Sequence, residues 1–298
     1  MNQRAQDYLG RVGVWSPIDT LSVDGLRDFA RQLEGWGYGS LWVPEAVGRD
    51  PFATLAYLAG HTERLSFATG IANIYARDAL TMKALHATLA GFLPQRFVLG
   101  LGVSHEMLVS QLRGHEYKKP IAAMRGFLEA MDKAVYMGPP PATPAPIVLA
   151  ALRPAMLKLA GELTHGAHPY LVPVEHTRRA REQLGKSAWL CPEQKVLLER
   201  DPKKARAIAR KVLEMYLGLP NYVRNLRDYG FDDGDFKDGG SDALVDALVA
   251  WGDESALHDR IEAHLAAGAD HVCIQTLRAD GQLGPDLALL ERLAPGKH

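Results

Sequence analysis

Residues 35–70 read GWGYGSLWVPEAVGRDPFATLAYLAGHTERLSFATG, and this stretch decides the fold. Two short apolar runs within it, at residues 40–43 and 65–69, have the length and composition of buried strands. Between them, Asp50 and Pro51 are the residue types that cap a helix and occupy its first position. The stretch therefore predicts a strand, a helix and a second strand in succession, which is the repeating unit of an α/β protein.

The same alternation continues along the chain in both directions. Apolar residues at helical spacing separate the apolar runs, as in Leu26, Phe29, Ala30 and Leu33. Eight strands are predicted, at residues 12–15, 40–43, 65–69, 97–101, 147–151, 167–172, 195–198 and 271–277. Eight strands that are each followed by a helix make a (β/α)8 TIM barrel, so the fold class is α/β.

The segment between the seventh and eighth strands is longer than the others. It has about 70 residues, too many for one helix and two short loops, and predicts a helical insertion at roughly residues 203–252. A doubly wound sheet is the competing fold, but it needs a GxGxxG string after its first strand. The nearest string here is GLGVSH, residues 100–105, which lacks the third glycine. We expect residues 1–298 to form one barrel domain, because α/β barrels of this length are often single domains.

Composition excludes several classes of protein. The 34 Lys and Arg residues nearly balance 35 Asp and Glu, so no charge field favours nucleic acid or an anionic membrane surface. Cys191 and Cys273 form no CxxC motif, which excludes a zinc ribbon, a disulfide framework and a thioredoxin motif. The beginning, MNQRAQDYLGRVGVW, has no apolar signal region, and no apolar run approaches the ~18 residues of a membrane span. A cytoplasmic protein without nucleic-acid or membrane partners is predicted.

Candidate site residues follow the predicted strands, because active sites of such barrels lie at the carboxyl ends of the strands. Glu45 follows the second strand, although an exposed loop carboxylate would fit the same position. Gly70 beside Ile71 suggests a bulge or a close backbone approach to a ligand, or merely the end of the third strand. Ser104 and His105 follow the fourth strand, although most histidines are surface or core residues.

Arg153 follows the fifth strand and precedes a helix that begins at Pro154. A helix N-terminus with a nearby arginine can bind an anion, and a solvated loop cation is the alternative. Metal-dependent hydrolysis is disfavoured because the first strand, VGVW, lacks histidine ligands, so no metal is expected. No GxSxG motif is present, which disfavours a serine hydrolase. The residues favour a site for a flat organic cofactor.

Four stretches resemble the bacterial luciferase-like superfamily of flavin and deazaflavin enzymes, in that family's order and spacing. They are GWGYGSLWVPE (35–45), RLSFATGIANIYARDA (64–79), QRFVLGLGVSH (95–105) and AGADHVCIQ (267–275). The resemblance covers about residues 11–295. The string TGIANIYARD is most similar to the branch that uses the 5-deazaflavin coenzyme F420.

The resemblance implies a set of cofactor-binding residues at three strand ends. They are Gly70, Ile71, Ala72, Asn73, Ser104, Leu152 and Arg153. In this family the peptide that corresponds to Gly70–Ile71 is cis and supports the ring from behind. Leu152, Arg153 and Pro154 match the turn that holds the cofactor phosphate, although this turn reads AALRP where several relatives are glycine-rich.

Two catalytic residues are also implied. Glu45 matches the acidic position beside the deazaflavin ring, and His105 is the candidate for proton transfer or substrate polarisation, with Glu45 as its electrostatic neighbour. An unperturbed histidine titrates near pH 6.5 and can do either at neutral pH. Related sugar-phosphate dehydrogenases have Asp-His where this chain has Glu45-Ala46, which argues against that substrate.

Three functions are consistent with these observations. The first is an oxidoreductase that transfers a hydride between coenzyme F420 and a small organic substrate, with the cofactor supplying the redox chemistry. The second is an FMN-dependent monooxygenase, and the third is a non-catalytic barrel that binds a flavin-like ligand or nothing. The resemblance also implies a homodimer, because members of the family usually pair through barrel helices.

Overall fold

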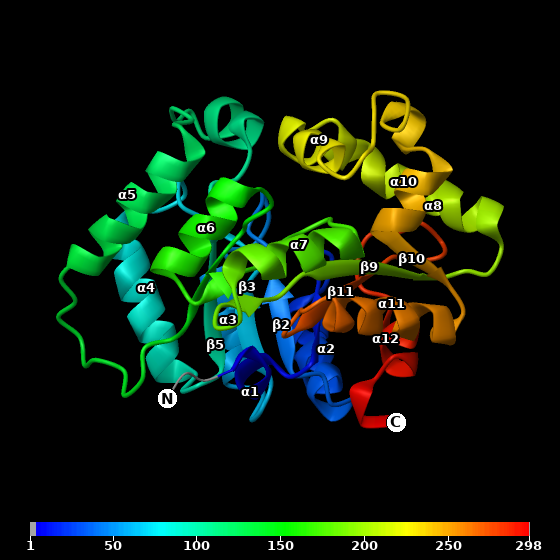
Figure 1. The fold of residues 1–298 in the computed structure, drawn as a ribbon. Helices are drawn as coiled ribbons and strands as arrows, with labels where there is room; N and C mark the ends of the chain where they lie inside the picture. Colours follow the sequence, from blue (N-terminus) through cyan, green and yellow to red (C-terminus); the bar gives the residue numbers. More distant parts are fainter. Residues whose placement is uncertain (1–3, 298) are drawn as a thin grey trace.

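Parallel strands curl into a barrel with helices on its outside in the computed structural model, which describes residues 4–297 (Figure 1). The strands are paired in the order β10-β9-β11-β1-β2-β3-β5-β6-β7-β8, and β4 pairs with β5. Their bounds are β1 Val12–Trp15, β2 Ser40–Val43, β3 Ser66–Thr69, β4 Ala72–Asn73, β5 Phe97–Gly102, β6 Ile147–Leu149, β7 Gly166–Ala167, β8 Trp189–Leu190, β9 Glu193–Leu198, β10 Val249–Gly252 and β11 Val272–Thr276.

The sheet closes on itself through a single stretch of chain. Strand β8 pairs with β7, and strand β9 pairs with β11. Only Cys191 and Pro192 separate β8 from β9, so together they act as one barrel strand. With β8 and β9 counted together, the barrel has the eight predicted positions, and the predicted fold class is confirmed.

The helices begin where the sequence predicts them. In α2 (Val23–Gly35) the Ser22 side chain accepts the Gly25 N–H, and in α3 (Pro51–Ala59) Asp50 caps the helix with Pro51 in its first position. The other barrel helices are α1 Ala5–Leu9, α4 Ala79–Phe92, α5 Pro120–Lys133, α6 Pro154–Leu163, α7 Val174–Leu184, α11 Glu254–Ala266 and α12 Leu287–Arg292, with η1 Met107–Leu112 and η3 Pro295–Lys297. No helix among residues 4–297 is long and apolar enough to cross a membrane.

Helix α1 was not predicted, and it lies at the lower end of the barrel (Figure 1). Its Tyr8 and Leu9 are buried, and the Tyr8 ring contacts the Trp189 ring with centroids 5.7 Å apart. The Ser66 hydroxyl donates to the Tyr8 carbonyl at 2.5 Å. This helix therefore covers the amino-terminal ends of the strands.

The predicted helical insertion between the last two barrel strands is present. It contains α8 (Pro202–Leu217), α9 (Pro220–Arg227), η2 (Lys237–Gly239) and α10 (Asp242–Leu248), together with the strand β10, which was not predicted. These elements stand together above one side of the barrel, coloured yellow to orange in Figure 1. They have an apolar cluster of their own, which the barrel residues Leu171, Leu197 and Leu277 join.

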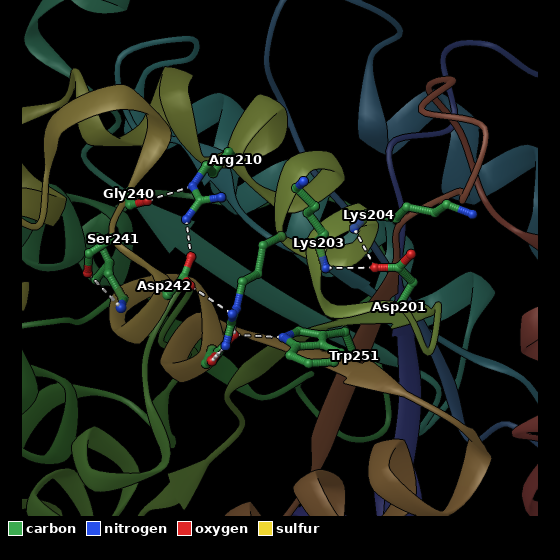
Figure 2. A network of polar contacts seen from close by, with 11 residues as sticks. Asp201, Lys203, Lys204, Arg210, Gly240, Ser241, Asp242 and Trp251 are labelled. Carbon is green, nitrogen blue, oxygen red and sulfur yellow. Dashed lines mark hydrogen bonds and ion pairs between the residues drawn. The ribbon is translucent and has the colours of Figure 1, made fainter.

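Ion pairs connect α8 to α10 within the insertion. Arg206 contacts Asp242 at 2.7 Å and Asp246 at 2.6 Å. Arg210 also contacts Asp242 and donates to the Gly240 carbonyl at 2.8 Å, as Figure 2 shows. Asp242 and Asp246 of α10 each have an arginine partner on α8, so this network holds the two helices together.

The predicted sixth strand, at residues 167–172, is wrong for most of its length. Strand β7 ends at Ala167, and Pro169 follows without an N–H to donate. Leu171 has a φ of 57°, in the left-handed region, and its N–H donates to the Glu193 carboxylate at 3.1 Å. The Leu171 N–H is therefore hydrogen-bonded to a side chain, that of Glu193, and not to a neighbouring strand.

Four buried histidines make the stability of this fold dependent on pH. Burial lowers the pKa of His168, His176 and His271 to about 4 and that of His264 to about 3. In the unfolded chain such rings bind a proton near pH 6.5, so the unfolded state holds more protons at intermediate pH. We predict that the free energy of unfolding falls as pH drops from about 6.5 to 4, by up to about 1.4 kcal/mol per pH unit for each ring.

Urea unfolding at about pH 7.5 and about pH 5 measures this effect. His271→Gln should reduce the difference between the two free energies of unfolding, because it removes one buried titrating ring. His115→Gln, at an exposed position, is the control and should leave the difference unchanged. Equal unfolding free energies at both pH values in the unmodified protein would contradict the prediction.

Candidate functional site

The predicted site residues all follow strands at the same end of the barrel. Glu45 follows β2, the Gly70–Ile71 peptide follows β3, and Ser104 and His105 follow β5. Leu152 and Arg153 follow β6 and precede α6. Adjacent strands β2, β3, β5 and β6 thus bring these four groups to one edge of the sheet.

The chain forms a tightly held bulge where β3 ends. The Gly70–Ile71 peptide is cis, as predicted. The Gly70 carbonyl accepts a hydrogen bond from the Trp15 indole N–H at 2.8 Å, and the Gly70 N–H donates to the Val43 carbonyl at 2.8 Å. The Ile71 carbonyl accepts the Glu45 N–H at 3.2 Å. The bulge is therefore held by β1 inside the barrel and by β2 beside it.

Glycine is required at the bulge because the space around it is filled. A Cβ at Gly70 would lie 2.7 Å from Trp15 Nε1 and 3.2 Å from His168 Nε2. A Cβ at Gly102 would lie 2.4 Å from the Cδ1 atom of Ile71. The glycines of β5 thus make room for the Ile71 side chain, and a close approach of this backbone to a ligand stays a prediction.

Ala72 and Asn73 form the short strand β4 directly after the bulge, and both are buried. The Asn73 side-chain oxygen accepts the Tyr75 N–H at 2.9 Å, so this amide closes a local turn. The Asn73 N–H donates to the Glu45 carboxylate at 2.8 Å. Strand β4, formed by Ala72 and Asn73, is therefore fixed directly after the bulge by its contact with Glu45.

Glu45 is a fixed carboxylate with partners on both oxygens. Besides the Asn73 N–H it binds Arg77, with Nη1 and Oε1 2.6 Å apart, and the Glu45 side chain is only 8% exposed. Arg77 also pairs with Asp50, and its guanidinium lies 4.7 Å from the centre of the Phe52 ring. None of the contacts found among the described residues joins Glu45 to His105, so the predicted electrostatic pairing of these two is not observed.

His105 is half-buried and faces the insertion. Its ring centre lies 5.5 Å from that of Tyr222 on α9. Burial lowers the pKa of His105 below its usual value near 6.5, so the imidazole is neutral at neutral pH. Ser104, which precedes it, has a φ of 56°, and its carbonyl accepts the Tyr117 hydroxyl at 3.3 Å.

Arg153 occupies the N-cap position of α6 without a capping side-chain bond. Its side chain is 50% exposed, and Nε lies 3.4 Å from the carboxylate of Asp228, which ends α9. The Leu152 carbonyl accepts a hydrogen bond from His176 at 2.7 Å. Among the contacts of the described residues only Nε of Arg153 is used, so its Nη donors are available to another anion.

The sequence analysis missed a buried ion pair inside the barrel. Lys195 and Glu193 are almost completely inaccessible to solvent, and Nζ lies 3.1 Å from Oε1. Burial lowers the pKa of Lys195 and raises that of Glu193. The available signal was the spacing of these two charged residues, two apart in a strand, which puts them on one face.

Tyrosine rings surround the Lys195 ammonium. Nζ lies 3.9 Å from the centre of the Tyr170 ring and 5.1 Å from that of Tyr216. The Tyr170 hydroxyl donates to Gln275 at 2.8 Å and lies 2.7 Å from the Tyr216 hydroxyl. The Tyr170 ring also packs on Trp15, with centroids 4.9 Å apart. We call Glu193, Lys195, Tyr170 and Trp15 the interior column, because together they reach the Gly70 carbonyl.

No group of three or more His, Cys, Asp or Glu side chains within residues 4–297 is arranged to hold a metal ion.

Comparison with known proteins gives one family and several similar folds. The model of the luciferase-like monooxygenase family matches residues 8–271. The chain is 27% identical over 264 residues to a 5,10-methylenetetrahydromethanopterin reductase of Methanolobus tindarius, covering 78% of this chain and 77% of that protein.

Two solved structures have similar folds. An F420-dependent secondary alcohol dehydrogenase in complex with an F420–acetone adduct has a TM-score of 0.74 at 14% identity, covering 97% of this chain and 99% of that one. The oxygenating constituent of a 3,6-diketocamphane monooxygenase from Pseudomonas putida, in complex with FMN, has a TM-score of 0.66 at 18% identity. That match covers 96% of this chain and 98% of the other.

We predict that Trp15→Phe weakens binding of the flavin-type cofactor that the resemblance implies. Phenylalanine keeps most of the packing on Tyr170 but leaves the buried Gly70 carbonyl without its donor, at a cost of about 1–3 kcal/mol. Fluorescence titration should therefore give a dissociation constant raised about ten-fold.

Trp251→Phe is the matched control, because it removes an indole N–H that donates to Asp246 at 2.8 Å, away from the bulge. Both variants should lose stability in urea unfolding, but only Trp15→Phe should lose affinity. Equal affinities in the two variants would show that the Trp15–Gly70 bond does not hold a cofactor support.

Proposed function

Because this chain belongs to the luciferase-like monooxygenase family, we propose that it is an oxidoreductase that transfers a hydride between coenzyme F420 and a small organic substrate. The observation that carries this proposal is the bulge at Gly70–Ile71, held by Trp15, Val43 and the Glu45 N–H between the candidate catalytic residues. Such a preorganised support lowers the cost of ordering on binding. Similarity to proteins named as F420-dependent enzymes supports the choice of cofactor.

The residues present fit a flat, partly apolar ring with a charged tail. Ile71 would support the ring, on a bulge so closely packed that Gly70 and Gly102 have no room for a Cβ. Arg153 and the amides at the start of α6 would bind the phosphate, because guanidinium donors and a helix N-terminus both favour an anion. When bound, coenzyme F420 would supply the hydride chemistry at its C5 atom.

The protein's own groups would place the substrate and move its proton. A neutral His105 imidazole can accept the proton of a substrate hydroxyl or hydrogen-bond to a substrate carbonyl. Glu45 has both oxygens engaged, so it would position Arg77 and Asn73 and would not act as a base. The insertion brings Tyr222 against His105, which keeps water from one side of the imidazole.

An FMN-dependent monooxygenase is the second candidate. The similarity of fold to an FMN-bound monooxygenase favours it. The turn of residues 150–154, which reads AALRP where several relatives are glycine-rich, instead favours a non-catalytic barrel. Homodimerisation, a cytoplasmic location and a single domain over residues 1–298 stay predictions.

Titration with each cofactor distinguishes the candidates. We expect coenzyme F420 to bind about ten-fold or more tightly than FMN, as measured by the visible spectrum and by the rise in melting temperature that a ligand of the folded state causes. Tighter binding of FMN would favour the monooxygenase, and binding of neither cofactor would favour a non-catalytic barrel.

We predict that His105→Ala lowers kcat by about 10²–10⁴-fold on an identified substrate, the usual contribution of general acid–base catalysis. The dissociation constant of the cofactor should change little, since the bulge and Arg153 are untouched. His105→Gln, which can still donate a hydrogen bond, should retain more activity where polarisation of a carbonyl is the main role. Full turnover in His105→Ala would rule out both roles.

A further inference from the structure

A hollow of about 510 Å³ opens beside Glu45 at the site end of the barrel. It is lined by residues 45–50 after β2, by Ala76 and Arg77 after β4, and by Leu112 and Arg113 at the end of η1. We call this the arginine hollow, because three arginines, Arg49, Arg77 and Arg113, lie on its wall.

The two carboxylates on the wall of the hollow share one cation. Glu45 and Asp50 both pair with Arg77, and Asp50 also accepts the Ala53 N–H as the cap of α3. The three arginines on the wall therefore exceed its two carboxylates by one positive charge.

Arg49 and Arg113 have no carboxylate partner within 4.0 Å among the described residues. The Arg49 guanidinium donates to the Ile18 carbonyl at 3.0 Å, while the nearby Asp19 carboxylate accepts the Arg49 backbone N–H. The Arg113 guanidinium has one long contact, 3.5 Å to the Ala46 carbonyl. Each guanidinium has five N–H donors, so most of them are unused.

Apolar side chains stand beside these unused donors. Val47 and Leu112 are 74% and 60% exposed, although both are on the wall of the hollow. Guanidinium groups bind carboxylate and phosphate with two parallel hydrogen bonds, and exposed apolar groups favour the organic part of a ligand. The wall therefore has the chemistry to bind an organic anion.

We propose that the arginine hollow binds the carboxylate or phosphate group of the organic ligand of this enzyme, through Arg49 and Arg113. This inference rests on the proposed function, since the hollow shares Glu45 with the site. The acidic group belongs either to the substrate or to the acidic tail of the cofactor. It is distinct from the anion position at Arg153, which follows β6 on the far side of β3 and β5.

The hollow also contacts the segment that carries His105. Helix η1 begins two residues after His105, and the Val109 N–H donates to the His105 carbonyl at 3.0 Å. Arg113 follows the other end of the same helix. An anion held by Arg113 would therefore fix η1 and, through it, the backbone position of His105.

Inorganic pyrophosphate is the probe for the first experiment, which needs no cofactor. At constant ionic strength set with chloride, we expect pyrophosphate to raise the melting temperature of the unmodified protein, because it binds the folded state. The double variant Arg49→Ala with Arg113→Ala should bind pyrophosphate about ten-fold more weakly or worse. Arg200→Ala removes one exposed arginine between β9 and α8 and should bind as the unmodified protein does.

Single lysine replacements keep the charge and test the geometry. Arg113→Lys should lose part of the affinity, because lysine cannot form two parallel hydrogen bonds to one oxyanion. Circular dichroism checks that each variant is folded. The same stabilisation in the double variant as in Arg200→Ala, or none in the unmodified protein, would overturn the proposal, whatever the cofactor titration gives.

A second arm identifies the source of the acidic group. The double variant is titrated with coenzyme F420 and with the same deazaflavin lacking its phosphate and carboxylate tail. Weaker binding of the complete coenzyme alone supports the proposal and assigns the group to the cofactor. Unchanged binding of both, with a raised KM for an acidic substrate and an unchanged kcat, supports it and assigns the group to the substrate.

Discussion

The buried ion pair of Lys195 and Glu193 is the interaction on which the rest of the structure depends. Removing two charges from water costs several kcal/mol for each ion, and their mutual attraction offsets this only with further partners. Those partners come from two other segments of the chain. Tyr170 and Tyr216 place their rings against the ammonium, and the Leu171 N–H donates to the free oxygen of Glu193. Because Tyr216 belongs to α8, its contact with the Lys195 ammonium also holds the insertion against the barrel.

The same interior column reaches the bulge from below. Tyr170 contacts Lys195 on one side and packs on Trp15 on the other, and Trp15 donates to the Gly70 carbonyl. The insertion, the buried charges and the end of β3 are therefore joined by consecutive contacts. Packed interiors are not continuously deformable, so a change at any of these positions is felt by the others. Consecutive contacts through Lys195, Tyr170 and Trp15 thus connect Glu193 to the Gly70 carbonyl.

Local signals predict the strands and helices well because they do not depend on closure of the barrel. The apolar run at residues 40–43 and the Asp50-Pro51 cap reappear as β2 and the start of α3. Two of the failures have long-range causes. Residues 167–172 have the composition of a strand, yet Leu171 turns toward a carboxylate 22 residues away. Likewise, the sequence predicts that Glu45 follows the second strand, but it does not predict that Glu45 pairs with Arg77, because Arg77 lies 32 residues further along the chain.

The charges at the barrel mouth suit a reaction whose chemistry belongs to a cofactor. Arg77 pairs with both Glu45 and Asp50, so the Glu45 carboxylate is not left without a cation, and burial keeps His105 neutral at neutral pH. A hydride carries negative charge, and an unpaired carboxylate beside it would oppose its approach. Within residues 4–297, the cations without a carboxylate partner on the wall of the arginine hollow are Arg49 and Arg113, at the edge of the site. Under the proposed function, the centre of the site would act through shape and hydrogen bonding, and these peripheral charges would orient the ligand, so that binding energy positions the reacting atoms.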